Sequence, residues 1–533
     1  MIKHQIKSLL QKTSPSLYIM VQQILHKDIV TLNKKKFLSV LRQIEARIKE
    51  SCPTVQDNQP PIVLLVTPWL RTAIPYQFLL WAYLYRLQGR DVLVLWNDLV
   101  DEFEGKTEIE QFEIKSVVKE LTGSVVPLRR LSEFTSNTND MDMPMDQLHR
   151  ESVSMVIHQV RSAFILREHQ DLTDRYMNGL LRDFPYVRKF AETYQGSRVV
   201  VPGGICGNTS LFYHFQKKPW NLRISSLDTC CSGNSRPATH KDCFFAFQKY
   251  ATALDDVQKK RIEGMGEHLF HERVHGIDDI TGNGPIQRSA FREDLHYDVV
   301  IVPNVEWDSA ALNIEDVFST ASEWLQTTLD YLLENTNYRI ALRQHPAEQE
   351  VIELFKYPNY LAEFLKERYS EYPRFTFFSA EDDVNTYSLI KNAKVILPWT
   401  SDIAVDAAVM GKISVVHTHA YYQDEPYVKR CHSVDEYLRT ICEVINSREE
   451  NVYLAEAKMA YFLHYQFSAL YPHLGKEKKY DCFDSIMEGF NHYLEKPLED
   501  ICRDEMLTML LDGWYNDEDF VLLRLQKEGI LQS

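Results

Sequence analysis

The sequence predicts an α/β protein with two parallel β-sheets and an added helical segment at its N-terminus. Two observations carry this prediction. Short apolar runs alternate with amphipathic helical segments, first over residues 62–121 and again over residues 297–417. Such alternation at roughly thirty-residue spacing is typical of parallel βαβ units. Between the two series lies 276–285, which contains three glycines and is the best candidate for an interdomain hinge.

Length and composition agree with several folded domains. A chain of 533 residues can hold two or three sizeable cores, and 44% hydrophobic with 25% charged residues is ordinary for globular protein. The net charge of −16 argues against nucleic acid as a partner. The predicted blocks are a basic helical segment with its linker (1–60), an N-terminal Rossmann-like domain (61–285), a C-terminal Rossmann-like domain (286–435) and a helical region (436–533).

The first fifty residues are basic, unlike the rest of the chain. They carry ten lysines and arginines against three acids, a net charge of +7, so that the remaining residues carry −23. Ile2, Ile6, Leu9 and Leu10 share one helical face among lysines, as in helices that lie on anionic lipid. The alternative, which base rates for charged helix faces favour, is a helical cap packed on the next domain.

The sequence gives no sign of secretion or of a membrane span. Nine cysteines without a CxxC pair are typical of reduced thiols in a cytoplasmic protein. The early apolar run is interrupted by Lys and Gln, unlike a signal peptide. The longest apolar window, 62–70, ends at Arg71 and is too short to cross a bilayer. We expect a cytoplasmic protein that can also bind the inner face of the membrane.

The first α/β series is predicted to start strand–helix–strand–helix and to continue with long helices. The apolar runs are short and rich in Val, Ile and Leu, whereas the helical segments show apolar residues at three- and four-residue spacing. The predicted strands are 62–67, 91–96, 199–201 and 222–226, and the predicted helical segments are 75–87, 108–121, 151–195 and 250–273.

Two loops in this series invite functional interpretations. Asp140 and Asp142 form a DxD pair, but they lie in polar sequence and not at a strand end, which favours a solvated loop over a metal site. The glycine-rich stretch 202–210, PGGICGNTS, lets backbone approach a ligand closely but does not have the dinucleotide-binding spacing. A tight turn and an acceptor-binding loop both remain open for it.

The second series contains the predicted functional site. Its first part, 338–348, reads as a buried strand that stops at Gln344 and turns into a helix. Pro346 suits the first helical position, which places His345 at or next to the N-cap. Unpaired N–H groups and the positive end of the helix dipole meet there and favour an anion. The predicted strands are 297–303, 339–343, 375–378, 395–397 and 413–417, and the predicted helices are 318–335, 346–369, 384–391, 402–410 and most of 433–528.

A second strand-to-helix step follows about fifty residues later. Thr400 and Ser401 are N-cap residue types, and Gly411 is placed to be a C′ glycine. Two polar helix starts at one edge of a parallel sheet form a crevice of the kind in which open α/β sheets bind ligands. His417 and His419 follow a strand and are better explained as a satisfied strand end than as ligands.

Three motifs carry a family resemblance over about 120 residues, namely PNVEWDSA (303–310), LRQHPAE (342–348) and PWTSDIAVDAAVMGKISVV (398–416). In this order they resemble bacterial capsule-type polysaccharide biosynthesis glycosyltransferases, which have the GT-B fold of two facing Rossmann-like domains. The His-Pro and Thr-Ser steps are similar to those of sialyltransferases and Kdo transferases. The chain departs from those families at Thr400-Ser401, where paired serines are common, and at Asp406, where a Glu is common.

The resemblance implies a metal-free and cofactor-free transfer from a nucleotide-activated sugar, a CMP-linked sialic acid or Kdo-type ulosonic acid, to a surface glycan. The first domain then lies on the acceptor side and the second on the donor side. Helix N-termini, Arg343 and His345 supply positive field and directed donors without a metal. The predicted donor-binding residues are Arg343, His345, Pro346, Thr400, Ser401, Asp402, Asp406 and Ser309, and the predicted catalytic residues are His345 and, as base candidates, Asp308 and Glu306.

Each of these residues can also have a purely structural role. His345 and Ser401 can be helix caps, Asp402 can be a favourable first-turn acid, and Asp308 and Glu306 can be ordinary loop acids. A first-domain acid is an equally good base. At the level of the whole protein, the alternatives are a transferase for UDP- or other NDP-sugars, a sugar-nucleotide epimerase, and a catalytically silent scaffold subunit of a glycan-assembly complex.

Overall fold

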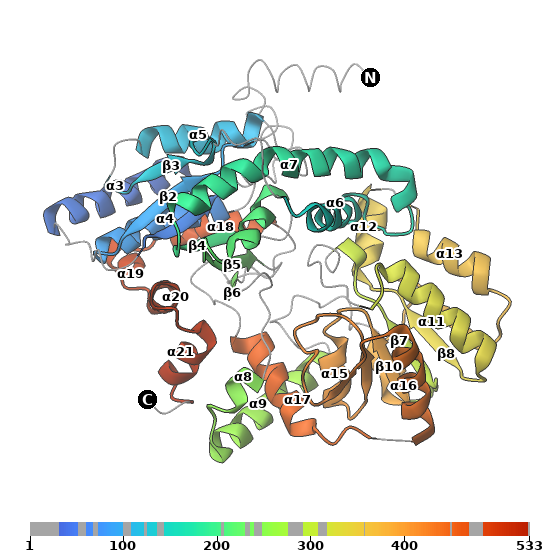
Figure 1. Cartoon of the computed structure of the whole chain (residues 1–533). Coiled ribbons are helices and arrows are strands. Elements are labelled where there is room, and N and C mark those ends of the chain that lie inside the picture. Colours follow the sequence, from blue (N-terminus) through green and yellow to red (C-terminus); the bar gives the residue numbers. More distant parts are fainter. Residues whose placement is uncertain are drawn as a thin grey trace. The chain divides into compact units, whose positions relative to one another are not determined.

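The computed structural model gives the chain two compact units (Figure 1). The first unit comprises 1–149, 174–243 and 469–524, and the second comprises 150–173, 244–468 and 525–533. Each is built on one six-stranded sheet, which confirms the predicted α/β class with two Rossmann-like domains. The structure describes residues 31–51, 60–67, 73–99, 108–121, 125–135, 143–203, 207–229, 235–238, 248–275, 291–307, 317–355, 358–447, 450–467 and 483–530.

The sheet of the first unit has the strand order β3-β2-β1-β4-β5-β6. The first five strands are parallel, and β6 runs antiparallel to β5. This is the doubly wound order, with the reversal between β1 and β4. The strands are β1 (Ile62–Val66), β2 (Val92–Trp96), β3 (Leu128–Arg130), β4 (Arg198–Pro202), β5 (Arg223–Thr229) and β6 (Ser235–Ala238).

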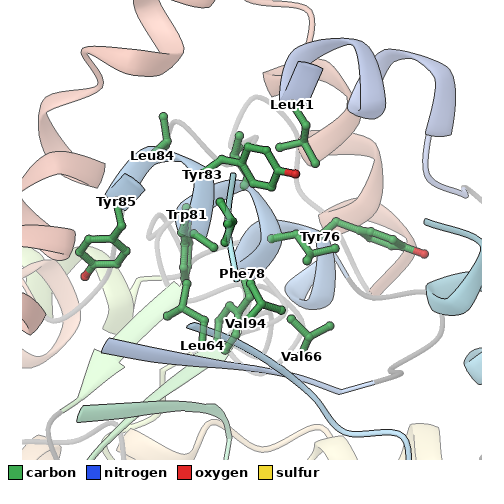
Figure 2. Packing of buried hydrophobic residues seen from close by; sticks show 14 of the residues in the cluster. Leu41, Leu64, Val66, Tyr76, Phe78, Trp81, Tyr83, Leu84, Tyr85 and Val94 are labelled. Carbon is green, nitrogen blue, oxygen red and sulfur yellow. The ribbon is translucent and has the colours of Figure 1, made fainter. Parts of the chain in front are cut away.

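The core of the first unit lies between this sheet and helix α4 (Ile74–Leu87). Figure 2 shows Trp81 and Phe78 of α4 over Leu64 and Val94 of the sheet. The helix is buried on nearly all sides, because residues 74–85 all have little exposed surface. A helix that is apolar all round belongs in the middle of a core. Other helical segments of this unit are α5 (Glu108–Leu121), the greater part of α7 (Gln170–Thr193) and the short 3₁₀ segments η1 (Leu131–Glu133) and η3 (Gly207–Phe215).

The basic N-terminal segment is, where the structure describes it, a helical cap. Helix α3 (Lys34–Ser51) buries one apolar face, including Phe37, Leu41 and Ile44, in the core that contains α4. Its charged residues face outward, and Arg42 pairs with Glu120 at 2.9 Å. The packed-cap interpretation is therefore confirmed for 34–51, and residues 1–30 lie outside the described chain.

The C-terminal helices return to the first unit. They are α18 (Phe483–Tyr493), α19 (Leu498–Cys502), α20 (Glu505–Asn516) and part of α21 (Phe520–Lys527). The Tyr85 hydroxyl donates to the Leu511 carbonyl at 2.7 Å. Arg90 pairs with Asp512, and buried Arg198 of β4 pairs with Asp517, whose left-handed backbone ends α20. The helical region therefore belongs in part to the first unit.

The sheet of the second unit repeats the same topology. Its strand order is β12-β11-β10-β7-β8-β9, all parallel, with the reversal between β7 and β10. The strands are β7 (Val299–Val302), β8 (Ile340–Arg343), β9 (Phe375–Phe378), β10 (Val395–Pro398), β11 (Ser414–Val416) and β12 (Val428–Arg430).

Helices cover both faces of this second sheet, and apolar residues fill the two layers between. They are α8 (Gln248–Ala251), α9 (Asp256–Val274), α11 (Ala321–Asn335), α12 (Ala347–Phe355), α13 (Tyr360–Tyr369), α14 (Thr386–Lys391), α15 (Ile403–Val409), α16 (Val434–Ser447) and α17 (Leu454–Phe462), with the 3₁₀ segment η2 (Leu166–His169), the π-helical segment η4 (Leu463–Phe467) and most of α6 (Met145–Val160).

The boundaries of the units differ from the predicted blocks. Helices α8 and α9 belong to the second unit although they precede residue 285, and 483–524 belong to the first unit although they follow residue 436. Contiguous blocks of sequence do not capture this assignment, because a helix that is far from a sheet along the chain can still pack on that sheet. The predicted hinge 276–285 lies outside the described residues.

Helices α9 and α17 cross at van der Waals distance. Gly266 lies at the crossing, where an added Cβ atom would be 1.9 Å from the Lys458 carbonyl oxygen. On either side of it, the Lys458 ammonium group pairs with Glu267 at 3.2 Å and approaches Glu263 at 3.9 Å. A glycine at this position is therefore what lets the two helices approach so closely.

Candidate functional site

The candidate site lies in the second unit, at the carboxyl ends of β7, β8 and β10. The strand order reverses between β7 and β10, and open α/β sheets bind ligands at this kind of point. The segments that leave these three strands carry most of the predicted site residues. Glu306 follows β7, His345 follows β8, and Thr400 to Asp402 follow β10.

His345 caps its own helix, as the sequence predicted. Its Nδ1 accepts a hydrogen bond from the Ala347 amide at 3.2 Å, at the start of α12. Because Nδ1 is an acceptor, the neutral ring carries its proton on Nε2. No described residue pairs with Nε2. Burial and the guanidinium groups of Arg343 and Arg273 lower the pKa of His345 to about 4, so that at neutral pH it is an uncharged N–H donor.

Arg343 lies beneath this position and not in the open. Its side chain is 3% exposed, and its guanidinium donates to the Ser379 carbonyl. Burial lowers the pKa of Arg343. Among the described residues its Nε has no hydrogen-bond partner although it is buried. Arg343 therefore contributes positive field and one unpaired buried donor at the end of β8.

The step after β10 is tightly constrained. Thr400 has a φ of +44°, a left-handed conformation that a β-branched residue rarely adopts and that is found mostly at functional sites. Its hydroxyl oxygen is buried and has no partner in the described part of the chain. Ser401 is 9% exposed and accepts from the Ile403 amide at 3.4 Å, while Gly411 ends the helix with the predicted positive φ of +78°.

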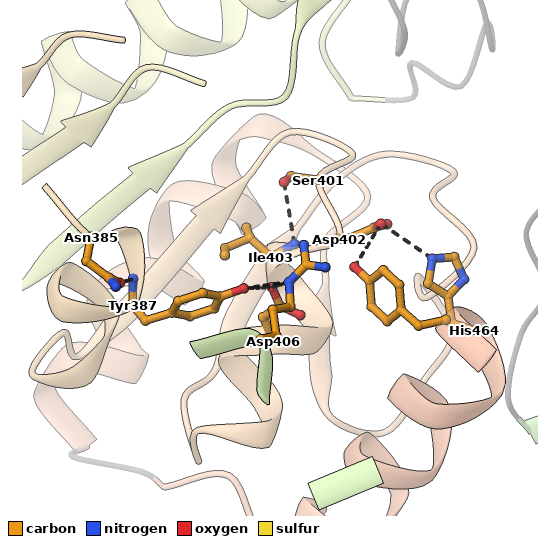
Figure 3. Close-up of polar contacts among 9 residues, drawn as sticks. Asn385, Tyr387, Ser401, Asp402, Ile403, Asp406 and His464 are labelled. Carbon is orange, nitrogen blue, oxygen red and sulfur yellow. Dashed lines mark hydrogen bonds and ion pairs between the residues drawn. The ribbon is translucent and has the colours of Figure 1, made fainter. Parts of the chain in front are cut away.

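Asp402 connects this step to the π-helical segment η4. Its carboxylate accepts from the Tyr465 hydroxyl at 3.1 Å and lies 3.4 Å from Nε2 of His464 (Figure 3). The His464 ring stacks on Tyr421, with ring centroids 4.7 Å apart. A π-helical turn often marks a functional site. No local sequence pattern indicates His464 and Tyr465, which lie more than sixty residues from Asp402.

Asp406 is a correction to the sequence analysis. The prediction made it a donor-binding residue, but its side chain is only 1% exposed. It accepts from the Tyr387 hydroxyl at 2.9 Å, and Nε of Arg273 lies 3.8 Å away (Figure 3). Arg273 in turn donates to the Tyr387 hydroxyl at 2.8 Å. Asp406 thus fixes α15 from behind the site, together with two residues that no sequence motif indicated.

Glu306 binds the backbone of the segment at Ala163, which belongs to the same unit. Its Oε2 accepts from the Ala163 amide at 2.7 Å. Burial raises the pKa of Glu306 to about 7, although the Ala163 amide and the Ser162 hydroxyl stabilise its charged form. A carboxyl group with a pKa near neutrality is suited to proton transfer. The other base candidate, Asp308, and Ser309 lie outside the described residues.

His417, directly after β11, is buried in an aromatic cage, and its ring is not hydrogen-bonded within the described residues as the predicted satisfied strand end would require. Four rings surround it with centroids 4.9 to 5.5 Å away, those of Phe318, Trp324, Trp399 and Tyr437. Its ring nitrogens have no described partner, and burial lowers its pKa to about 3. His419 lies on the surface, where its Nδ1 is 3.1 Å from the side chain of Gln423.

The first unit has a buried polar cluster at the carboxyl edge of its own sheet. Asn97, which follows β2, donates to Asn208 at 2.7 Å, and Asn208 donates to Asp183 at 3.0 Å. All three side chains are 2% exposed. Asn208 belongs to the predicted glycine-rich loop, so this part of the loop anchors the edge of the sheet. Asp140 and Asp142 lie outside the described residues.

Within the described residues, no group of three or more His, Cys, Asp and Glu side chains could hold a metal ion. None of the described helices is both long and apolar enough to cross a bilayer.

Comparisons with known proteins give distant structural similarity. No family model and no curated protein matches the chain. The chain is similar to two KpsC β-Kdo transferases of Thermosulfurimonas dismutans. The 2,7 transferase is 15% identical with a TM-score of 0.34, covering 58% of this chain and 89% of that one. The 2,4 transferase is 14% identical with a TM-score of 0.32, covering 56% and 86%.

Epimerases are among the similar structures as well. A putative UDP-N-acetylglucosamine 2-epimerase from Listeria monocytogenes is 8% identical with a TM-score of 0.23, covering 87% of this chain and 98% of that one. Similarity at this level does not assign an activity, so the functional argument depends on the residues of the site.

Proposed function

We propose that this chain is a glycosyltransferase that binds a nucleotide-activated sugar at the carboxyl edge of the second unit. The observation that carries the proposal is His345, a neutral imidazole held by its own helix start, whose Nε2–H has no partner among the described residues. The end of β8 also carries the buried charge of Arg343, and two buried polar atoms at the ends of β8 and β10, Arg343 Nε and Thr400 Oγ1, have no described partners. A buried polar atom without a partner needs an explanation, and a bound ligand is one such explanation.

The chemistry of such a transfer suits this arrangement. Negative charge develops on the leaving phosphate as the glycosidic bond breaks, and preorganised donors near that oxygen lower the barrier. A donor on Nε2 of His345 and the N–H groups at the start of α12 act in the same direction as the Arg343 charge. The base that accepts the proton of the acceptor hydroxyl is proposed to be Asp308 or Glu306, of which Glu306 has a pKa of about 7.

We further propose a cytidine nucleotide, carrying a sialic acid or Kdo-type sugar, as the donor and a surface glycan as the acceptor. The support is the similarity of the His345-Pro346 and Thr400-Ser401 steps to those of CMP-sugar enzymes. No cofactor or metal is part of the proposal. A transferase for UDP- or other NDP-sugars remains the alternative, because the proposed phosphate contacts would not discriminate between nucleotide bases.

A thermal-shift panel with CMP, CDP, UDP and GDP tests the donor. A ligand that binds the folded state stabilises it by about 2.7 kcal/mol at a hundred times its dissociation constant. We expect CMP to raise the melting temperature most at equal concentration. Stabilisation by UDP and not by CMP would rule out the cytidine assignment and favour the NDP-sugar alternative.

Two assays separate the remaining alternatives. Hydrolysis or transfer of the donor sugar indicates a transferase, whereas inversion at C2 of the free nucleotide sugar indicates an epimerase. A protein that binds the nucleotide but turns over no donor with any acceptor is the scaffold subunit.

Membrane association is proposed for the basic residues before α3. The apolar face of α3 is buried, so residues 34–51 do not offer it to lipid. The basic residues that remain are Lys3, Lys7, Lys12 and Lys27. Each basic residue contributes about 1 kcal/mol to the free energy of binding to anionic lipid. Sedimentation with anionic liposomes is expected to fall when salt is added or residues 1–30 are deleted. Equal sedimentation of the full-length and truncated chains at low salt would contradict this.

A further inference from the structure

A cavity of about 30 Å³ lies in the second unit, close to the candidate nucleotide-binding edge. It has room for one or two water-sized groups. Both polar and apolar side chains line it, so it differs from a packing defect in a hydrophobic core. The lining residues that matter for its chemistry are Arg161, Ser162, Trp307, Glu348, Ile352 and Asn359.

Glu348 is held in place by a hydrogen-bonded amide pair behind it. Its Oε2 accepts from Nε2 of Gln344 at 2.6 Å. The Gln344 side chain forms a reciprocal amide pair with Asn359, 2.9 Å in each direction, and its Oε1 also accepts from the Ala380 amide. Every hydrogen-bonding atom of this amide is thus engaged. Such a supporting shell holds the carboxyl group in one orientation, as a built binding site requires.

The protonation of Glu348 is unusual for its position. A carboxyl group in the first turn of a helix normally gains from being ionised, because the helix dipole favours negative charge there. Burial, followed by the nearby Glu306 carboxyl, instead raises the pKa of Glu348 to about 8. At neutral pH the group carries a proton and offers both an O–H donor and a carbonyl acceptor.

Trp307 and Arg161 give the cavity an aromatic and a cationic side. The Arg161 guanidinium lies over the indole ring, 5.4 Å from its centroid. The Trp307 carbonyl oxygen is 3.1 Å from Nδ1 of His158. These contacts fix the indole beside Glu348 and Asn359, so that the lining presents donors, acceptors and a flat apolar surface together.

We propose that this cavity is a saccharide subsite, which takes a hydroxyl group of a sugar ring beside Glu348 and Asn359. A hydroxyl group donates and accepts at once, and so matches a neutral carboxyl next to an amide. His345 lies three residues before Glu348, so the subsite adjoins the proposed phosphate position. The choice of a saccharide rests on the proposed function.

Saturation-transfer NMR with the methyl glycosides of glucose, galactose, mannose and N-acetylglucosamine, at millimolar concentration, tests the subsite. We expect the wild-type chain to bind at least one of them. Glu348→Ala removes the carboxyl group, and Ile352→Trp fills the cavity from α12. Each should weaken binding about tenfold, the effect of losing one good hydrogen bond or its space.

Two more variants make the result specific. Glu353→Ala changes an exposed acid on the same helix, which accepts from Gln349 at 3.2 Å, and should leave binding within about twofold. Glu348→Gln keeps a neutral group with a donor and an acceptor, and should retain most of the binding. Absence of binding by the wild type, or equal binding by the wild type, Glu348→Ala and Ile352→Trp, overturns the proposal. Nucleotide stabilisation is measured separately on each variant, so failure of the nucleotide site is distinguishable from failure of the subsite.

Discussion

Replacing His345 by alanine is expected to lower the turnover of the donor sugar by about two to three orders of magnitude, as losing one preorganised charge-stabilising donor commonly does. The lost donor would act on charge that appears as the leaving group departs. The change should therefore appear mainly in kcat, with a smaller change in nucleotide affinity. Steady-state kinetics and nucleotide thermal shifts on the same preparation measure the two effects.

His345→Asn is the matched control for the role of His345 as a cap. Asparagine is among the best N-cap residues, so this variant should keep the stability that the alanine variant loses, about 1 kcal/mol. Its short side chain cannot reproduce the Nε2–H donor, and its turnover should fall as far as that of alanine. Near-normal turnover in a folded His345→Ala protein would show that His345 acts only as a helix cap.

Ser401→Ala provides a second comparison at the same site. This substitution should lower turnover less than the loss of His345 does, because the backbone N–H groups that follow β10 remain. If both side chains act on one phosphate, the double variant should lose less than the sum of the two single losses.

Replacing Gly266 by alanine is expected to destabilise the second unit by about 3 kcal/mol. The new methyl group would lie 1.9 Å from the Lys458 carbonyl oxygen and 2.7 Å from its carbon, which are backbone atoms that a rotamer change cannot move. The two helices must separate, and overpacking of this kind commonly costs about 1 to 3 kcal/mol or more. Chemical denaturation followed by a spectroscopic probe of the second unit measures the change.

Gly264→Ala is the control on the same helix. Nothing lies within 4 Å of an added Cβ atom at this exposed position. Alanine is favoured over glycine by about 1 kcal/mol inside a helix, so this variant should be at least as stable as the wild type. Equal stability of the two alanine variants would contradict the close helix crossing.

The fold could be predicted from sequence wherever the signal was local. The central strands are short runs of Val, Ile and Leu, and they were found because strands buried on both faces are continuously apolar. The strands that were missed lie at sheet edges. Leu128–Arg130 and Val428–Arg430 carry arginines and lysines, and Ser235–Ala238 contains a proline, as edge strands often do. Their polar composition is typical of loops.

In the candidate site as well, the features that depend on neighbouring residues in the sequence were predicted and those that depend on tertiary packing were not. The cap by His345 and the helix-ending Gly411 follow from residues within one turn of each other, so the sequence predicts them. The face of α15 that points outward depends on what packs behind it, which is why Asp406 was misplaced. Arg273 and His464 reach the site from α9 and η4, respectively, and no local pattern distinguishes them from other polar residues in helices.

The path of the chain has a consequence for how this protein can be divided. The backbone passes from one unit to the other five times, at residues 149, 173, 243, 468 and 524. A gene fragment that ends after the first sheet lacks α18, α19 and α20, whose residues Trp514 and Phe490 belong to the core of that unit. A fragment that begins at residue 286 lacks α9, and with it Arg273. Neither half is a transferable module, so recombination that exchanges donor or acceptor specificity must replace several separate segments together.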